Sequence, residues 1–392
     1  MTDTGKFVEK IRPHEEGFLK SGGNRIGRID IELTERCDNN CIHCSINIPE
    51  NSTRQSEELT TSEWKRIIRE AADLGVLRIR FTGGEPLLRD DFIELYSFTR
   101  KLGIKVIIFT NARKITETIA RMLSDIPPLE KMEVSVYGMS RESYEKVSRI
   151  PGSYNEFRAG VDLLIRHRIP FIVKGIILPD NLQDREDFER WAVTLPWMKQ
   201  KPSYSSGFEL RERRDSGAKN RLIRTLRRDP DERDPERETR GPTIEFLKKF
   251  SGPPGSALFS CGAGESGSID PYGMIHPCLT LKADEFAYDL RKGTIADAVF
   301  NYFPKILDVK TSNPDYLRKC SNCFLKGLCL QCPSRSWSET GTFDTPVEFL
   351  CRVTHAKARK LGLLKENENS WEISDWKERI HKLEENGNDS DR

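Results

Sequence analysis

The sequence predicts an α/β fold in which a parallel sheet forms a partial (β/α)6 TIM-like barrel, followed by a cysteine-rich extension. Two observations support this fold class. Short β-rich runs alternate with helical runs between residues 28 and 210, which is typical of parallel βαβ units. About five or six such units fit in this stretch, fewer than the eight of a closed barrel, so we expect the barrel to be open.

Five segments have the composition of β-strands, and each ends in a small or polar residue just before its loop. An α/β barrel places its chemistry in these loops. The predicted strands are residues 28–35, 77–83, 104–110, 132–138 and 171–178.

The first predicted helix begins at a capping-box pattern made by Thr60 and Glu63. Apolar residues at helical spacing follow it, namely Trp64, Ile67, Ile68 and Ala71. Three further helices are expected at residues 91–102, 114–125 and 153–168.

Composition excludes several classes of protein. The 392 residues include 63 Lys and Arg against 61 Asp and Glu, and this balance of +2 favours neither a nucleic acid nor an anionic membrane as partner. No apolar stretch is long enough to span a bilayer, and the N-terminus lacks the apolar run of a secretory signal. We therefore expect a cytoplasmic protein, in which cysteines are more often metal ligands or redox groups than disulfides.

Charge and cysteine distribution suggest five regions. The segment between residues 209 and 240 is dense in charges of mixed sign and marks a boundary. The expected regions are an N-terminal extension (1–27), the barrel (28–210), a charged linker or helical region (211–254), a cysteine-rich domain (255–355) and a C-terminal helix with a tail (356–392).

The first cysteine group is CxxxCxxC, formed by Cys37, Cys41 and Cys44 on the loop after the first predicted strand. Three thiolates so close in sequence can hold three irons of a 4Fe-4S cluster and leave the fourth iron without a protein ligand. A zinc site is the alternative, but structural zinc requires four ligands, and the nearest extra candidate, His43, lies inside the loop.

A second motif, Gly83, Gly84, Glu85 and Pro86, ends the second predicted strand. The glycines allow the backbone to approach a ligand closely, and Glu85 can accept a hydrogen bond from an ammonium group. Together the two motifs make residues 28–210 similar to the radical S-adenosylmethionine (radical SAM) superfamily. This resemblance implies that S-adenosylmethionine (AdoMet) binds the open iron and is reductively cleaved to a 5'-deoxyadenosyl radical, which abstracts a substrate hydrogen.

The resemblance also implies the residues that contact AdoMet. Gly83, Gly84, Glu85 and Pro86 would line its methionine moiety, with Glu85 facing the amine. The backbone of His43 would face the adenine. Ser135 is the candidate ribose contact and Asn111 a further one, although either residue could instead serve as a turn or cap residue.

The second cysteine group resembles the SPASM extension of radical SAM proteins, which holds two auxiliary 4Fe-4S clusters. By the family pattern, Cys320, Cys323, Cys329 and Cys351 would close one cluster. Cys261, Cys278 and Cys332 would hold the other, which would leave one iron open. One spacing departs from the family, because two residues separate Cys329 from Cys332 where three are usual. A zinc ribbon is the alternative interpretation of the paired CxxC motifs.

The resemblance implies a maturase of a ribosomally synthesised peptide, which would introduce a thioether or carbon–carbon crosslink, an epimerised residue or an oxidised side chain. A separate leader-binding protein and a ferredoxin or flavodoxin would be its partners. Action on a haem precursor or a sugar-like small molecule is the alternative. Sulfatase maturation is less favoured, because Leu279 stands where that branch has a proton-accepting Asp. An electron carrier without AdoMet turnover is a further alternative, against which both intact motifs argue.

Overall fold

A computed structural model of the chain describes residues 26–205, 217–232, 247, 255–259, 261 and 263–388. These residues fall into two compact units. The barrel unit comprises Met1–Ser205 and Gly262–Ile306, and the C-terminal unit comprises Ser206–Cys261 and Leu307–Arg392. Residues 263–306, which we placed in the cysteine-rich domain, thus pack with the barrel.

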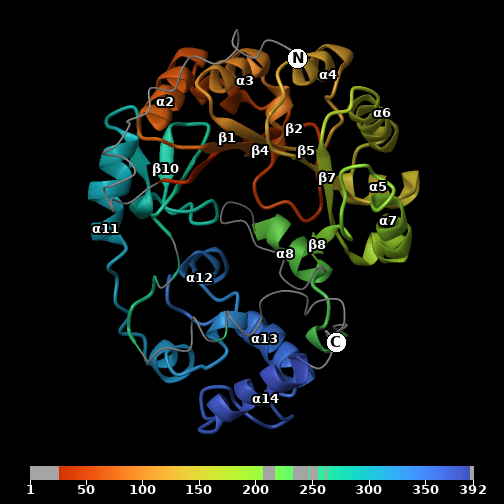
Figure 1. Cartoon of the computed structure of the whole chain (residues 1–392). Coiled ribbons are helices and arrows are strands. Elements are labelled where there is room, and N and C mark those ends of the chain that lie inside the picture. The colour runs from red at the N-terminus through yellow and green to blue at the C-terminus, as the bar shows by residue number, and fades with distance from the viewer. Residues whose placement is uncertain are drawn as a thin grey trace. The chain divides into compact units, whose positions relative to one another are not determined.

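The barrel unit is built on one nine-stranded sheet with the order β11-β10-β9-β1-β4-β5-β6-β7-β8 (Figure 1). All neighbouring strands from β9 to β8 are parallel, and the last two strands at the other edge are antiparallel. Among the described residues β11 and β8 do not pair, so the sheet is open, as the sequence predicted. The strands are β1 (Arg28–Thr34), β4 (Arg78–Gly83), β5 (Lys105–Thr110), β6 (Met132–Val136), β7 (Phe171–Ile176), β8 (Ser203–Ser205), β9 (Gly267–Ile269), β10 (Met274–His276) and β11 (Tyr288–Asp289), and a separate pair is β2 (Arg36–Cys37) with β3 (Ile48–Pro49).

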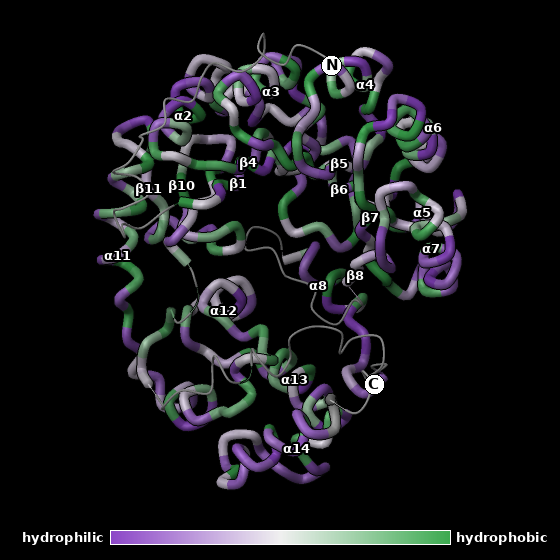
Figure 2. The backbone as a smooth tube through the Cα atoms, in the orientation of Figure 1, coloured by the Kyte–Doolittle hydropathy of each residue, from purple (hydrophilic) through white to green (hydrophobic). Residues whose placement is uncertain are grey.

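Helices connect the parallel strands and bury one face of the sheet. Thr60 caps the first of them through the predicted capping box with Glu63, and the predicted apolar positions are buried. Figure 2 shows hydrophobic and hydrophilic residues alternating along these helices, as expected for helices with one buried face. The helices are α2 (Thr61–Asp73), α3 (Phe92–Lys101), α4 (Glu117–Asp125), α5 (Arg141–Ser148), α6 (Ser153–Arg166), α7 (Arg185–Ala192) and α11 (Phe303–Ile306).

The C-terminal unit is mainly helical. A separate apolar core, which includes Phe324, Leu325 and Leu363, joins its loops to its last two helices. Its helices are α8 (Gly217–Leu226), α12 (Pro333–Thr340), α13 (Glu348–Lys360) and α14 (Trp376–Asn388). In the part of the chain that is described, no helix combines the length and apolar character needed to cross a bilayer.

Candidate active site at the carboxyl ends of the strands

The Gly-Gly-Glu-Pro turn lies against the chain segment that precedes the first cysteine. The backbone N–H of Gly84 donates to the carbonyl of Thr34 at 2.7 Å, and that of Glu85 donates to the carbonyl of Arg36 at 2.9 Å. A Cβ atom on Gly84 would lie 2.2 Å from the Arg36 carbonyl oxygen, so this approach requires glycine. The turn is thus in direct backbone contact with the segment that leads into the first cysteine.

The carboxylate of Glu85 is buried between β4 and β5. It accepts hydrogen bonds from the Thr110 hydroxyl and from the Asn111 backbone N–H, both at 2.8 Å, and from the Leu87 N–H at 3.2 Å. Burial, together with the nearby charge of Asp38, raises the pKa of Glu85 to about 8. In this structure the carboxylate joins two strand ends, and its contact with an AdoMet amine stays a prediction.

The cysteine loop is held from two sides. The side-chain amide of Asn111, just after β5, donates to the Asp38 carboxylate at 2.7 Å, and Arg113 forms an ion pair with the same carboxylate at 3.2 Å. On the other side, the backbone N–H groups of Asn40 and Ile42 donate to carbonyls in the last turn of α5. Of the predicted AdoMet contacts, Asn111 therefore touches the loop directly.

One aromatic residue, Tyr137, lies directly after β6 and within electrostatic reach of all three thiols of the loop. Burial and then the charges of its neighbours, Cys41 first among the thiols, raise the pKa of Tyr137 well above its ordinary value. Burial, Cys41 and Glu85 likewise raise the pKa of the Cys37 thiol. His43 lies beside Tyr137, with 5.7 Å between ring centroids. A Cys37 thiol whose ionisation is disfavoured, next to the buried Cys41, suits the iron centre that the motif implies.

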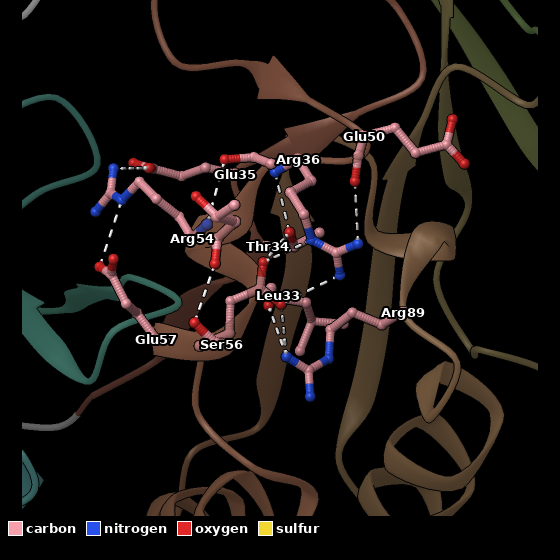
Figure 3. A network of polar contacts seen from close by, with 12 residues as sticks. Leu33, Thr34, Glu35, Arg36, Glu50, Arg54, Ser56, Glu57 and Arg89 are labelled. Carbon is pink, nitrogen blue, oxygen red and sulfur yellow. Dashed lines mark hydrogen bonds and ion pairs between the residues drawn. The ribbon is translucent and has the colours of Figure 1, made fainter.

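A buried carboxylate, Glu58, anchors the base of this loop. It accepts from the guanidinium groups of Arg36 at 2.9 Å and Arg89 at 3.2 Å, and from the Thr34 hydroxyl at 2.5 Å. Figure 3 shows Arg36, Arg89 and Thr34 converging at the end of β1. Arg36 directly precedes Cys37, so this network fixes where the cysteine loop begins.

The polar face of the sheet carries ionic groups that sequence reasoning missed. Lys282 pairs with Glu32 of β1 at 2.5 Å, and the Glu32 side chain is 1% exposed. On the same strand, Asp30 pairs with Arg80 of β4. Strand register places Ser135, the candidate ribose contact, on this same face. The partners come from distant segments, so local motifs do not reveal them.

In the C-terminal unit, Cys320 has Cys329, Cys323 and Cys351 as electrostatic neighbours, and their joint cluster stays a prediction. Burial and then the neighbouring thiols of Cys329, Cys323 and Cys351 raise the pKa of Cys320 to about 12. Burial and then Cys329 also raise the pKa of Cys351, and burial together with Cys329 and Cys351 raises that of Cys323. Thiols whose ionisation is disfavoured by burial and by neighbouring thiols suit a cationic centre.

The other three cysteines are divided between the units. Cys261 and Cys332 belong to the C-terminal unit and Cys278 to the barrel unit. Among the described residues, no group of three or more His, Cys, Asp or Glu side chains is arranged so that it could hold a metal ion. The assignment of clusters therefore rests on the donor chemistry described above.

Residues 31–192 match the sequence model of the radical SAM superfamily. Two relatives illustrate the match. A PqqA peptide cyclase of Rhizobium meliloti (strain 1021) is 32% identical over 42% of this chain and 43% of its own length. An AdoMet-dependent heme synthase of Methanosarcina barkeri (strain Fusaro / DSM 804) is 31% identical over 39% of this chain and 43% of its own length. The match thus spans about two-fifths of either relative.

Solved structures resemble the fold over nearly the whole chain. Native anSMEcpe with bound AdoMet and Cp18Cys peptide superposes with a TM-score of 0.59 at 12% identity, over 92% of this chain and 99% of that chain. Native anSMEcpe with bound AdoMet gives 0.56 at 12% identity, over 91% and 99% of the two chains. At such low identity the resemblance concerns the fold alone.

Proposed function

We propose that this protein is a radical SAM enzyme that modifies a ribosomally synthesised peptide. The observation that carries the proposal is the meeting of CxxxCxxC, the Gly-Gly-Glu-Pro turn and Asn111 at the carboxyl ends of β1, β4 and β5. Parallel α/β sheets place their chemistry at this end. The matching PqqA peptide cyclase supports a peptide as the substrate class.

In this proposal, Cys37, Cys41 and Cys44 hold a 4Fe-4S cluster, and the turn from Gly83 to Pro86, His43, Asn111 and Ser135 line the AdoMet site. The bound cluster and AdoMet supply the electron transfer and the radical that removes a substrate hydrogen. The chain's own residues position the reactants. Glu85 and Asp38 fix the strand ends, and the end of α5 accepts backbone hydrogen bonds that hold the cysteine loop.

The cysteines of the extension would hold two auxiliary clusters. Cys320, Cys323, Cys329 and Cys351 would form one closed site, and Cys261, Cys278 and Cys332 a second site with an open iron, which could take a thiol of the peptide. Anaerobic reconstitution followed by Mössbauer iron counting tests this assignment. We expect about twelve irons per chain, falling to about eight when Cys37, Cys41 and Cys44 are changed to Ala.

The peptide assignment is tested by incubating the reduced enzyme and AdoMet with each short peptide encoded beside its gene. A mass change in one peptide, accompanied by 5'-deoxyadenosine, is the expected result. AdoMet cleavage without a mass change in any of these peptides would reject a peptide substrate. A separate leader-binding protein and a ferredoxin or flavodoxin are the proposed partners.

A second candidate function is the modification of a small molecule such as a haem precursor. The observation that favours it is the match to an AdoMet-dependent heme synthase over a similar share of the chain. Tetrapyrrole genes beside this gene, and turnover of a haem precursor by the reduced enzyme, would support this candidate over the peptide.

A further inference from the structure

Two side chains outside the cysteine pattern contact the sulfurs of Cys323 and Cys351, two of the four cysteines of the proposed closed cluster. The Ser370 hydroxyl oxygen lies 3.0 Å from the Cys323 sulfur, and His355 Nε2 lies 3.8 Å from the Cys351 sulfur. His355 Nε2 and the Ser370 hydroxyl are themselves 2.9 Å apart. A continuous polar chain therefore joins two of the four thiols through Ser370 and His355.

The fold fixes both side chains. Cys351 and His355 lie one turn apart on α13, so they share a face of that helix. Ser370, which is 1% exposed, lies between α13 and α14. The neighbouring Trp371 packs against the His355 ring, with 5.6 Å between ring centroids. The contacts with sulfur are thus built into the packing of this unit.

Binding of a metal cluster would fix the direction of these hydrogen bonds. A ligated thiolate carries no proton, so it can only accept, and Ser370 must donate to Cys323. The Ser370 oxygen is then free to accept from His355 Nε2–H. Hydrogen bonds donated to cluster sulfurs stabilise the reduced state, which carries the greater negative charge.

We propose that Ser370, oriented by His355, raises the reduction potential of an auxiliary cluster held by Cys320, Cys323, Cys329 and Cys351. This inference rests on the proposed function only for the presence of that cluster. Ser370 and His355 are positioning residues, because they would act on the cluster through its ligands.

The test is a redox titration followed by EPR on the full chain with Cys37, Cys41 and Cys44 changed to Ala, so that only auxiliary clusters contribute. Ser370→Ala is expected to move one reduction step to a more negative potential at unchanged iron content. Ser370→Thr, which keeps the hydroxyl, is expected to restore that step. The control Thr311→Val removes a buried hydroxyl of the same unit that bonds Asp344, and should move neither step.

Unmoved potentials in Ser370→Ala at full iron content would overturn the proposal. If Ser370→Ala loses iron, the variant His355→Leu is used instead. A more negative reduction potential in His355→Leu at full iron content supports the proposal, and an unchanged potential overturns it. If the chain with Cys37, Cys41 and Cys44 changed to Ala and Ser370 intact takes up no iron, the auxiliary clusters themselves are refuted. This result is obtained before Ser370 is altered, so it is distinct from a failure of the present proposal.

Discussion

At the scale of single residues, the candidate site depends on one group whose pKa is shifted by its surroundings and on one position where a close contact requires a small residue. Glu85 is the clearest case, because its carboxylate is fully buried and its pKa is raised to about 8. Since the unfolded chain ionises this group near its ordinary value of 4.5, the folded state binds more protons between these values. The contribution of Glu85 to stability is therefore lost as the pH rises from about 4.5 to about 8.

Glu85→Gln removes this dependence, because the amide cannot ionise. We expect the difference in free energy of unfolding between the variant and the wild type to move in favour of the variant as the pH rises. Urea unfolding at intervals from pH 5 to 8 measures it, and comparing the two proteins cancels the titration of other groups. A difference that is flat over this range would contradict the raised pKa.

Gly84 illustrates the effect of size. Gly84→Ala places a methyl group against the carbonyl oxygens of Arg36 and Glu35, and the backbone must separate, at a cost of at least about 1–3 kcal/mol. We expect loss of iron at the CxxxCxxC loop together with a lower melting temperature. Gly27→Ala is the control, because its Cβ would meet nothing within 4 Å. Equal iron content in both variants would show that the contact is dispensable.

At the scale of elements, the five strands β1, β4, β5, β6 and β7 and the helices α2, α3, α4 and α6 follow from composition and periodicity. The predicted strand at residues 171–178 is β7 (Phe171–Ile176), and the predicted helix at 153–168 is α6 (Ser153–Arg166). Helices α5 and α7 were not predicted, because eight mostly polar residues carry too few apolar positions to show a period. The β9–β10 hairpin was also missed, although Asp270 to Gly273 form a turn-like sequence between apolar runs.

The cysteine loop is the element with the most specific anchor, the Glu58 network. Glu58→Ala leaves the buried guanidinium groups of Arg36 and Arg89 without their shared carboxylate, at an expected cost of about 3–5 kcal/mol. The melting temperature and the iron content should both fall. The neighbouring Glu57, whose side chain is 59% exposed, provides the control, and Glu57→Ala should change neither. Indistinguishable effects of the two substitutions would refute the anchoring role.

At the scale of the whole molecule, spacing and motif predicted the cysteines and the turn, while their supports could not be predicted. Asp38 and Arg113, or Glu32 and Lys282, meet only after the chain has folded, and neither pair has a local signal. Tyr137 did have one, because it lies near the carboxyl end of the predicted strand at residues 132–138. The chain also divides differently from the expected regions, since β9 pairs with β1 and so brings residues 263–306 into the barrel unit.

The ion pair of Glu32 and Lys282 joins residues 263–306 to strand β1. Lys282→Met leaves a carboxylate that is 1% exposed without its partner, and we expect a loss of about 3–5 kcal/mol in the free energy of unfolding. Lys292→Met, at a side chain that is 85% exposed, is the matched control and should be nearly neutral. Adding Glu32→Leu to Lys282→Met should recover part of the loss. A neutral Lys282→Met would contradict the pairing.

The central claim is that Cys37, Cys41 and Cys44 hold an iron-sulfur cluster with an iron free to bind AdoMet. The most direct measurement is 5'-deoxyadenosine formation by the anaerobically reconstituted, dithionite-reduced protein, with Cys41→Ala as the comparison. The account predicts cleavage of AdoMet by the wild type and none by the variant. A wild-type protein that carries its full iron and leaves AdoMet intact, or a variant that cleaves it at the same rate, would contradict the claim.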